Sequence, residues 1–174
     1  MSLTHTFDQA TLRTAFDRFP VGVAALCSRV GGHHEGMVTS SFAVGISYEP
    51  ALVSFSVRNE SRTWQRLKHG YRLGVSVLAD EHREVCYQLA SRDETKRFSG
   101  LDVTLADSGA LFLDRAALWL ETSVYDTVPA GDHTIVLLKV HAVSQGENHG
   151  EPIVLHGKTF HDLAQVRDRE LVTA

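Results

Sequence analysis

Apolar and polar residues alternate along much of the chain, and this alternation predicts strands more often than helices. After Pro50, the segment ALVSFSVR places Val53, Phe55 and Val57 on one side of a strand and serines on the other, as in a half-buried strand. The same alternation in ALWLETSVYDTV and TIVLLKVHAV, joined by the turn PAGDH, predicts two more strands, and PIVLHGKTF a short one. The pattern therefore predicts a chain built mainly of antiparallel strands.

The first half of the chain adds further strands. VGVAALCSR and EGMVTSSF are separated by VGGHH, whose glycines suit a hairpin turn. YRLGVSVLA is expected to form the next strand. With about six or seven strands joined by hairpin-length connections, a parallel sheet is not favoured.

Three segments have helical periodicity instead. Residues 6–19 carry apolar side chains on one face, and Thr6 stands at capping-box spacing before them. Residues 61–70 are expected to form a short helix, and Asp80 is expected to cap a third helix that continues to Leu89. Strands with so few helices predict a mainly β fold with peripheral α, a small antiparallel barrel. No repeat or linker divides the sequence, so residues 1–174 are predicted to form a single domain.

Composition narrows the class of protein. The chain has 174 residues, of which 43% are hydrophobic and 22% charged, as in an ordinary soluble domain. A net charge of −4 with scattered Lys and Arg gives no basic stripe for nucleic acid. The longest apolar run is about seven residues, which is too short to span a membrane. Two distant cysteines and a start that lacks signal-peptide blocks favour the cytoplasm.

Several familiar motifs fail on inspection. A phosphate loop ending in GKT at residues 157–159 would need glycine where the chain has Pro152. The sequence has neither a Gly-x-Gly-x-x-Gly dinucleotide fingerprint nor a Gly-x-Ser-x-Gly nucleophile elbow. His33, His34 and Glu35 are adjacent residues of a hairpin, which point in different directions, and no partner of ligand spacing follows. A metal site is therefore not predicted.

Three polar features remain, and they favour one class of ligand. Backbone amides and hydroxyls can bind the polar edge of a planar heterocycle, while helix N-termini and arginine can hold its phosphate. Taken singly, each feature also has a structural interpretation, such as a helix cap for Ser61. The three features are the strand segment Thr39-Ser40-Ser41, the polar face of Ser54 and Ser56 leading to Ser61 and Thr63, and the cationic loop Lys96-Arg97-Phe98.

Five segments carry a resemblance to a known family. In chain order they are LRTAFDRFPVGVAAL, GMVTSSFAVGISYEPALVSFSV, SRTWQRLKHGYRLGVSVL, SRDETKRFSGLDV, and AGDHTIVLLKV with a closing LHGKTF. Together they resemble the flavin reductase family with the FMN-binding split barrel, the small reductase components of two-component flavin-dependent monooxygenases. The resemblance runs from residue 12 to about residue 163. It implies an antiparallel, Greek-key-like split β-barrel.

The resemblance also implies a site. In that family the segment matching residues 38–42 lies along the isoalloxazine ring, largely through main-chain groups. Ser76 stands where many members have asparagine, and Phe160 where many have tyrosine. The cofactor-binding residues implied by the resemblance are Met37, Val38, Thr39, Ser40, Ser41, Phe42, Ser54, Phe55, Ser56, Ser61, Thr63, Ser76, Lys96, Arg97, Phe98 and Phe160.

His133, within Gly131-Asp132-His133, matches the family histidine expected near the nicotinamide and is the predicted catalytic residue. The local sequence equally allows a turn histidine that bonds to Asp132 or to the backbone. The resemblance implies NAD(P)H-dependent reduction of FMN or FAD, with NADH or NADPH as donor, in a homodimer that serves a partner monooxygenase. Two alternatives stay open: a flavin- or haem-binding carrier or sensor without NAD(P)H turnover, and a stand-alone flavoprotein oxidoreductase.

Overall fold

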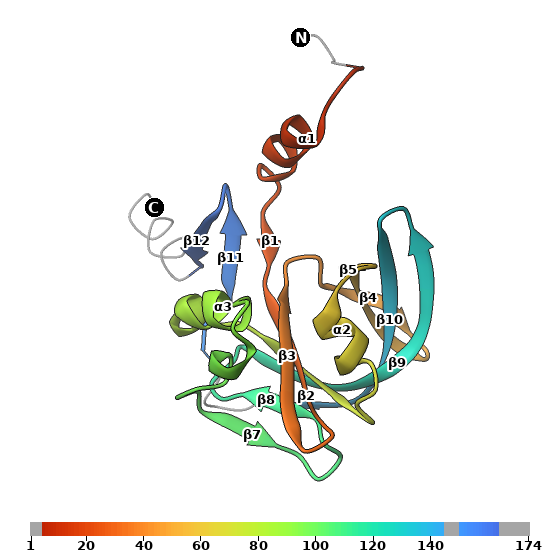
Figure 1. Ribbon diagram of the computed structural model, residues 1–174, viewed down its shortest axis with the longest axis vertical. Helices are drawn as coiled ribbons and strands as arrows, with labels where there is room; N and C mark the ends of the chain where they lie inside the picture. Colours follow the sequence, from red (N-terminus) through yellow and green to blue (C-terminus); the bar gives the residue numbers. More distant parts are fainter. Residues whose placement is uncertain (1–4, 145–149, 164–174) are drawn as a thin grey trace, which may run out of the picture.

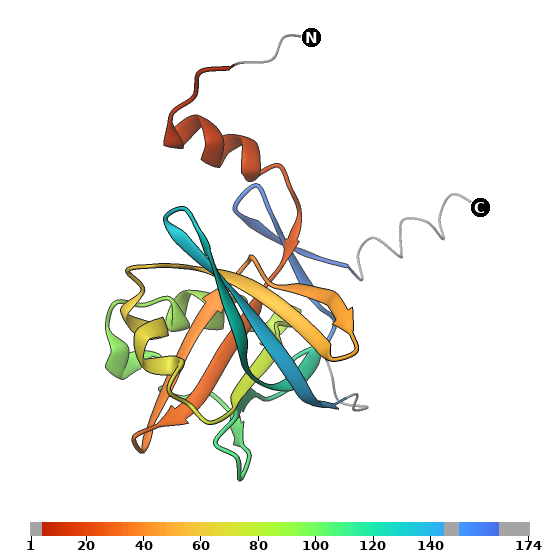
Figure 2. The same cartoon turned by 90° about the vertical axis from the view of Figure 1, so that its right-hand side faces the viewer.

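A computed structural model describes residues 5–144 and 150–163. Its main sheet is antiparallel, as the alternation predicts, and curls into a barrel (Figures 1 and 2). The ends of the predicted single domain over residues 1–174 lie outside the described residues, so that boundary stays a prediction. In sheet order the strands are β3 (His33–Thr39), β2 (Ala24–Val30), β6 (Leu73–Val77), β9 (Leu118–Ala130), β10 (His133–Ser144), β5 (Ala51–Arg58) and β4 (Ala43–Tyr48).

The two edge strands of this sheet, β3 and β4, are neighbours in sequence. β3 ends at Thr39 and β4 begins at Ala43, so residues 40–42 cross from one edge of the sheet to the other. No ladder of strand pairs joins β3 to β4 or β5 among the described residues. The barrel is therefore closed along this line by a short connection, and we call this line the seam.

Shorter strands complete the fold, and the hydrophobic pattern did not reveal most of them. A three-stranded sheet contains β1 (Val21–Gly22), β11 (Ile153–His156) and β12 (Thr159–Asp162). A two-stranded ribbon contains β7 (Val103–Leu105) and β8 (Leu111–Leu113). The turn between β11 and β12 includes Gly157 and Lys158, both with positive φ, so the segment predicted as one short strand is a hairpin.

The first helix differs from its prediction. α1 (Gln9–Phe16) is shorter than residues 6–19, and its cap is Asp8, whose carboxylate accepts a hydrogen bond from the Thr11 N–H at 2.8 Å. The predicted cap at Thr6 is wrong because an aspartate stands at a suitable N-cap position immediately before the helix. No residue of α1 is buried, and the helix projects from the barrel (Figures 1 and 2).

The second helix, α2 (Arg62–Leu67), begins where the sequence predicts. The Ser61 hydroxyl accepts the Trp64 N–H at 3.2 Å, the bond expected of a serine N-cap. Trp64 and Leu67 are buried in the core, and the Trp64 ring meets Phe55 edge-on at 5.2 Å between centroids. α2 therefore fixes the end of β5 relative to the barrel interior.

The third helix is preceded by a 3-10 turn. Asp80 does not cap it, contrary to prediction: the turn η1 (Asp80–His82) leads into α3 (Arg83–Leu89), and the His82 ring accepts the Ala79 N–H at 3.1 Å. The other ring nitrogen of His82 lies 3.0 Å from the Asp114 carbonyl oxygen. A buried histidine with two partners thus replaces the expected aspartate cap.

The core explains the continuous apolar run in the first half of the chain. Alternate residues of β2 face different clusters, with Ala24 and Leu26 in the barrel interior and Ala25 and Cys27 against α3, β8 and β11. A strand that is covered on both sides has no reason to alternate. Burial raises the pKa of the Cys27 thiol to about 12 and that of Cys86 to about 11, so the two thiols pack as apolar groups.

One close approach depends on a missing side chain. A Cβ built on Gly74 of β6 would lie 2.7 Å from the carbonyl carbon and 2.9 Å from the nitrogen of Leu111 in β8. Because those atoms belong to the main chain of a buried strand, they have little room to move. Glycine at this position lets the ribbon of β7 and β8 lie directly on the barrel.

Among the described residues, no helix combines the length and the hydropathy needed to cross a lipid bilayer.

Candidate functional site

A cavity of about 1010 Å³ opens at the seam, where β3 and β5 both end. Ligand sites commonly measure roughly 300–1,000 Å³, so this cavity has room for more than one planar ring system. Its walls include residues 37–41, Ser56, Ser61 and His133, which come from three separate parts of the chain. The structure thus brings together many of the residues that the sequence singled out. We call this space the seam cavity.

Ser41 holds the seam together. Its hydroxyl donates to the Ser56 carbonyl at 3.0 Å and accepts the Ser56 N–H at 2.9 Å. The last β4–β5 pair is Ala43 with Ser54, so Ser56 is the next position along β5 whose main chain can pair on that side. A side-chain hydroxyl therefore takes the place of one more backbone pair.

Thr39 and Ser41 are joined by two contacts. The Thr39 and Ser41 hydroxyls lie 2.8 Å apart, and the Ser41 N–H donates to the Thr39 hydroxyl at 3.2 Å. Ser40, between them, lies beyond the last β2–β3 pair, and no hydrogen bond within the described part of the chain uses its groups. The small hydroxylated residues therefore differ in role. The hydroxyls of Thr39 and Ser41 are used in hydrogen bonds within the cavity wall, whereas the polar groups of Ser40 remain available to a ligand in the cavity.

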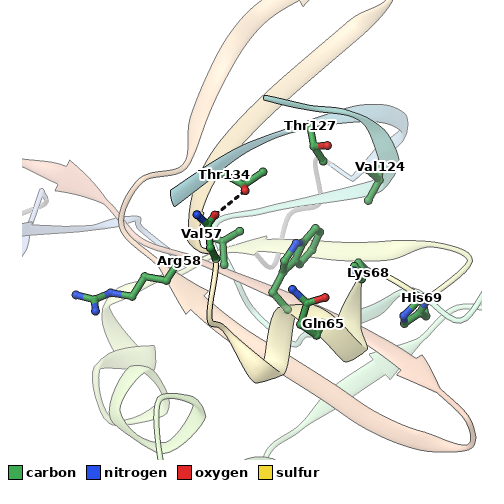
Figure 3. Close-up of a pocket in the computed structure, with 10 residues that line it drawn as sticks. Val57, Arg58, Gln65, Lys68, His69, Val124, Thr127 and Thr134 are labelled. Atoms are coloured by element: carbon green, nitrogen blue, oxygen red, sulfur yellow. Dashed lines mark hydrogen bonds between the residues drawn. The ribbon is translucent and has the colours of Figure 1, made fainter. Parts of the chain in front are cut away.

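Positive charge borders the cavity at two residues that the sequence analysis missed, Arg58 and Arg92. Arg58 is the last residue of β5. It continues the alternation of Ser54 and Ser56 along one side of the strand, and this pattern in the sequence could have identified it. Its side chain extends away from Lys68 and His69 at the end of α2 (Figure 3). Arg92 lies in the polar loop after α3, and Glu60 also lines the cavity. Two guanidinium groups beside one carboxylate suit an anionic ligand.

His133 is the first residue of β10, pairs with Arg58 of β5 and lines the cavity. Its Nδ1 lies 2.7 Å from the Asp132 carboxylate, and this bond holds the pKa of the Asp132 carboxyl below its usual value. The turn interpretation of His133 is therefore confirmed. Since the same ring also faces the cavity, the two interpretations are compatible.

The cationic loop lies beside the start of α2. The Arg97 guanidinium donates to the Thr63 hydroxyl at 2.9 Å and to the Ser91 carbonyl at 2.9 Å. Lys96 points to solvent and pairs with Asp93. The structure thus joins two of the predicted residues, Arg97 and Thr63, next to Ser61.

Phe98 anchors that loop on β3. A Cβ built on Gly36 would lie 2.6 Å from the tip of the Phe98 ring, so the ring approaches the strand this closely because residue 36 is glycine. The Phe98 ring also meets His34 edge-on, at 5.5 Å between centroids. Phe98 therefore packs behind the seam cavity and does not line it.

Other predicted residues lie away from the seam cavity. Phe55 is in the core, Phe42 packs against the barrel interior, and Phe160 packs against Tyr87. Ser54 is only 9% exposed, so β5 is covered on both faces and is not the half-buried strand that its alternation predicts. Ser76 is fully buried, and its hydroxyl accepts the Leu113 N–H at 3.0 Å. Phe55 and Phe42 therefore face the barrel interior, whereas Ser76 and Phe160 contact elements that pack on its outside.

The chain is similar to a known protein family and to two of its members. A family model described as flavin reductase like domain matches residues 16–164. A flavin reductase of Pseudomonas putida is 33% identical over 131 residues, which are 75% of this chain and 76% of that protein. The reductase subunit HsaB of a flavin-dependent monooxygenase from Rhodococcus jostii is 30% identical over 138 residues, 79% of this chain and 70% of that one.

A solved structure shares the fold closely. The NADH:FAD oxidoreductase SgcE6 of Streptomyces globisporus, in complex with NAD and FAD fragments, superposes with a TM-score of 0.82. It is 28% identical, and the match covers 92% of this chain and 96% of the other. The similarity therefore extends over the barrel and over all the segments that form the seam cavity.

Proposed function

We propose that this chain, which belongs to the flavin reductase like domain family, is an NAD(P)H:flavin oxidoreductase which supplies reduced flavin to a separate monooxygenase. One observation carries the proposal most directly. The residues that the family resemblance assigns to a flavin, residues 37–41, Ser56 and Ser61, meet His133 around one cavity. FMN or FAD would occupy that cavity, with NADH or NADPH as the electron donor.

The seam cavity fits a flavin in shape and in chemistry. A tricyclic ring needs a flat wall with hydrogen-bonding groups at its edge, and residues 37–41 offer small side chains together with the polar groups of Ser40. A flavin phosphate needs positive charge or helix N–H groups. Arg58 and Arg92 border the cavity, and Ser61 stands at the start of α2. We assign the ring to the wall at residues 37–41 and the phosphate to the side of Ser61.

The nicotinamide side is assigned to His133. When both nucleotides are bound, they supply the redox chemistry, in which a hydride passes from the nicotinamide C4 to the flavin N5. The protein contributes stacking, orientation and exclusion of water, and a fixed imidazole can position the pyridine ring. His133 is held by Asp132 on one side and faces the cavity on the other, which suits that task.

The activity can be tested with purified protein and NADH or NADPH. We expect oxidation of the nicotinamide, followed at 340 nm, to rise severalfold when free FMN or FAD is added, because flavin is a substrate that must leave for the oxygenase. Turnover that needs no added flavin would instead favour a stand-alone flavoprotein. Binding of flavin or haem without any turnover would favour the carrier or sensor and contradict the proposal.

A homodimer is part of the proposal, and α1 supports it. A helix of eight residues is marginal by itself in water, yet no residue of α1 is buried. Phe16 and Phe19 are 68% and 71% exposed, and they border an apolar cavity of about 560 Å³ beside Ser40 and Ser41. A second copy of the chain that covers this face would stabilise the helix. A cytoplasmic location belongs to the same proposal.

We expect light scattering to give twice the 19.2 kDa of one chain. Replacing Phe16 and Phe19 together by serine should shift the protein toward monomer at micromolar concentration, because roughly 1.5–3 kcal/mol per buried phenylalanine is lost. Tyr71 is exposed and does not line that apolar cavity, so Tyr71→Ser is the matched control. A monomeric wild type would contradict the dimer, and a double variant that stays dimeric would contradict the role of α1.

A further inference from the structure

We propose that Asn59 is a positioning residue that fixes the turn carrying His133 against the end of β5. This inference rests on the proposed function, because it assigns Asn59 to the nicotinamide side of the seam cavity. Asn59 follows the last residue of β5 directly and does not line the seam cavity itself. It would act only through the geometry of its neighbours.

Asn59 binds the turn at three points. Its side-chain Nδ2 donates to the Gly131 carbonyl at 3.2 Å, and its main-chain N–H donates to the Asp132 carbonyl at 3.1 Å. Its side-chain Oδ1 accepts the Thr134 hydroxyl at 2.8 Å, a bond drawn as a dashed line in Figure 3. The three bonds reach residues on both sides of His133, so one side chain and one amide clamp the whole turn.

The clamp lies where the strand ladder stops. His133 pairs with Arg58, which is the last residue of β5, and with Ala130 across its own hairpin. Among the described residues, the hydrogen bonds that reach residues 131 and 132 from outside the β9–β10 hairpin come from Asn59. Gly131 has a φ of +65°, so the turn itself is a tight glycine turn. Without Asn59 the hairpin end would be held only by its ladder with β5.

The clamp also orients the His133 ring. The ring is fixed through the Asp132 carboxylate at 2.7 Å, and the Asn59 side chain holds Gly131 on one side of this pair and Thr134 on the other. A small rotation of the turn would therefore move the imidazole relative to Ser56 and to residues 37–41, where we place the flavin ring. Misplacement of a positioning group by about 1 Å can lower rates by about two orders of magnitude. Asn59 is itself exposed, so its replacement is not expected to unfold the barrel.

The test compares three variants. Asn59→Ala removes both side-chain bonds, Thr134→Val removes one of them with little change of shape, and Thr127→Val is the control. Thr127 lines the same cavity beside α2 as Asn59 and Thr134, and among the described residues the side chain of Asn59 bonds to Gly131 and Thr134 and not to Thr127. For each variant we would measure KM for NADH, KM for flavin, the equilibrium Kd of NAD⁺ by calorimetry, and Tm.

We expect Asn59→Ala to raise KM for NADH and Kd for NAD⁺ about fivefold while the flavin KM changes less than twofold, with Thr134→Val intermediate and Thr127→Val unchanged. A purely structural clamp would lower Tm and leave the ratio of the two KM values as in wild type, which would overturn the inference. An active wild type with Asn59→Ala equal to Thr127→Val would also overturn it. A wild type that neither oxidises NADH nor binds NAD⁺ would overturn the proposed function and this inference together.

Discussion

Replacing Gly74 by alanine is expected to remove about 3 kcal/mol or more from the free energy of unfolding, the largest stability change that we predict. The new Cβ would lie within 2.9 Å of the carbonyl carbon and the nitrogen of Leu111. Removing this overlap requires β8 to move away from β6. β8 is fully buried and packs in the cluster that also contains Ala25 and Cys27 of β2. Urea unfolding followed by circular dichroism would measure the loss as a lower midpoint with little change in slope.

Gly22→Ala is the matched control for that variant. Gly22 also lies in a strand, β1, and a Cβ built there meets no atom within 4 Å. Since its φ is not in the left-handed region, alanine should be tolerated, with a change of at most about 0.5 kcal/mol. Equal midpoints for the two variants would show that β8 can yield, and would contradict the close contact between the ribbon and the barrel.

Ser41→Ala is expected to weaken flavin binding about tenfold, the largest change in ligand affinity that we predict. The change removes the hydroxyl that pairs with both main-chain groups of Ser56, leaving an N–H and a carbonyl without a protein partner at the cavity wall. Water would bind these two groups and would have to be displaced by the ring, and a tenfold change in Kd corresponds to about 1.4 kcal/mol. Quenching of flavin fluorescence during titration would measure it.

Ser123→Ala serves as the control for Ser41→Ala. The Ser123 hydroxyl also makes a side-chain hydrogen bond, with His141 at 2.8 Å, but it lies on β9 and outside the seam cavity. Its replacement should leave flavin affinity within twofold of wild type. If Ser41→Ala binds flavin as tightly as Ser123→Ala, the seam does not depend on the hydroxyl.

The sequence was sufficient for much of the fold because its periodic segments are long. The alternation in β5, β9 and β10 located the long antiparallel strands, and the serine before α2 located that helix. β4 was missed because AVGISY has no period of two and contains Gly45, whose φ is +72°. β7 and β8 are too short to show any period, while β1 and the start of β12 lie within segments that were each predicted as one strand.

The site was predicted in outline and less well in detail. The small residues after Met37 and the histidine of the GDH turn do meet at one cavity. Sequence could not reveal that Ser41 spends its hydroxyl on Ser56, because that bond joins residues 15 apart across the seam. Nor could it show that Ser76 is committed to Leu113, since β8 itself was not recognised. Long-range partners, which local patterns do not encode, decide which polar groups remain for a ligand.

At the seam, the energy needed to part the barrel wall differs from the energy needed to break a strand ladder, whereas in most barrels the two are the same. A barrel closed by strand ladders all round must break main-chain pairs before its wall can part, whereas here one serine side chain spans the line between β3 and β5. The wall can yield there while the paired strands of the main sheet keep their partners. Entry or release of a bulky ring at this line would then require the contact between Ser41 and Ser56 to open, while the ladders of the main sheet stay intact.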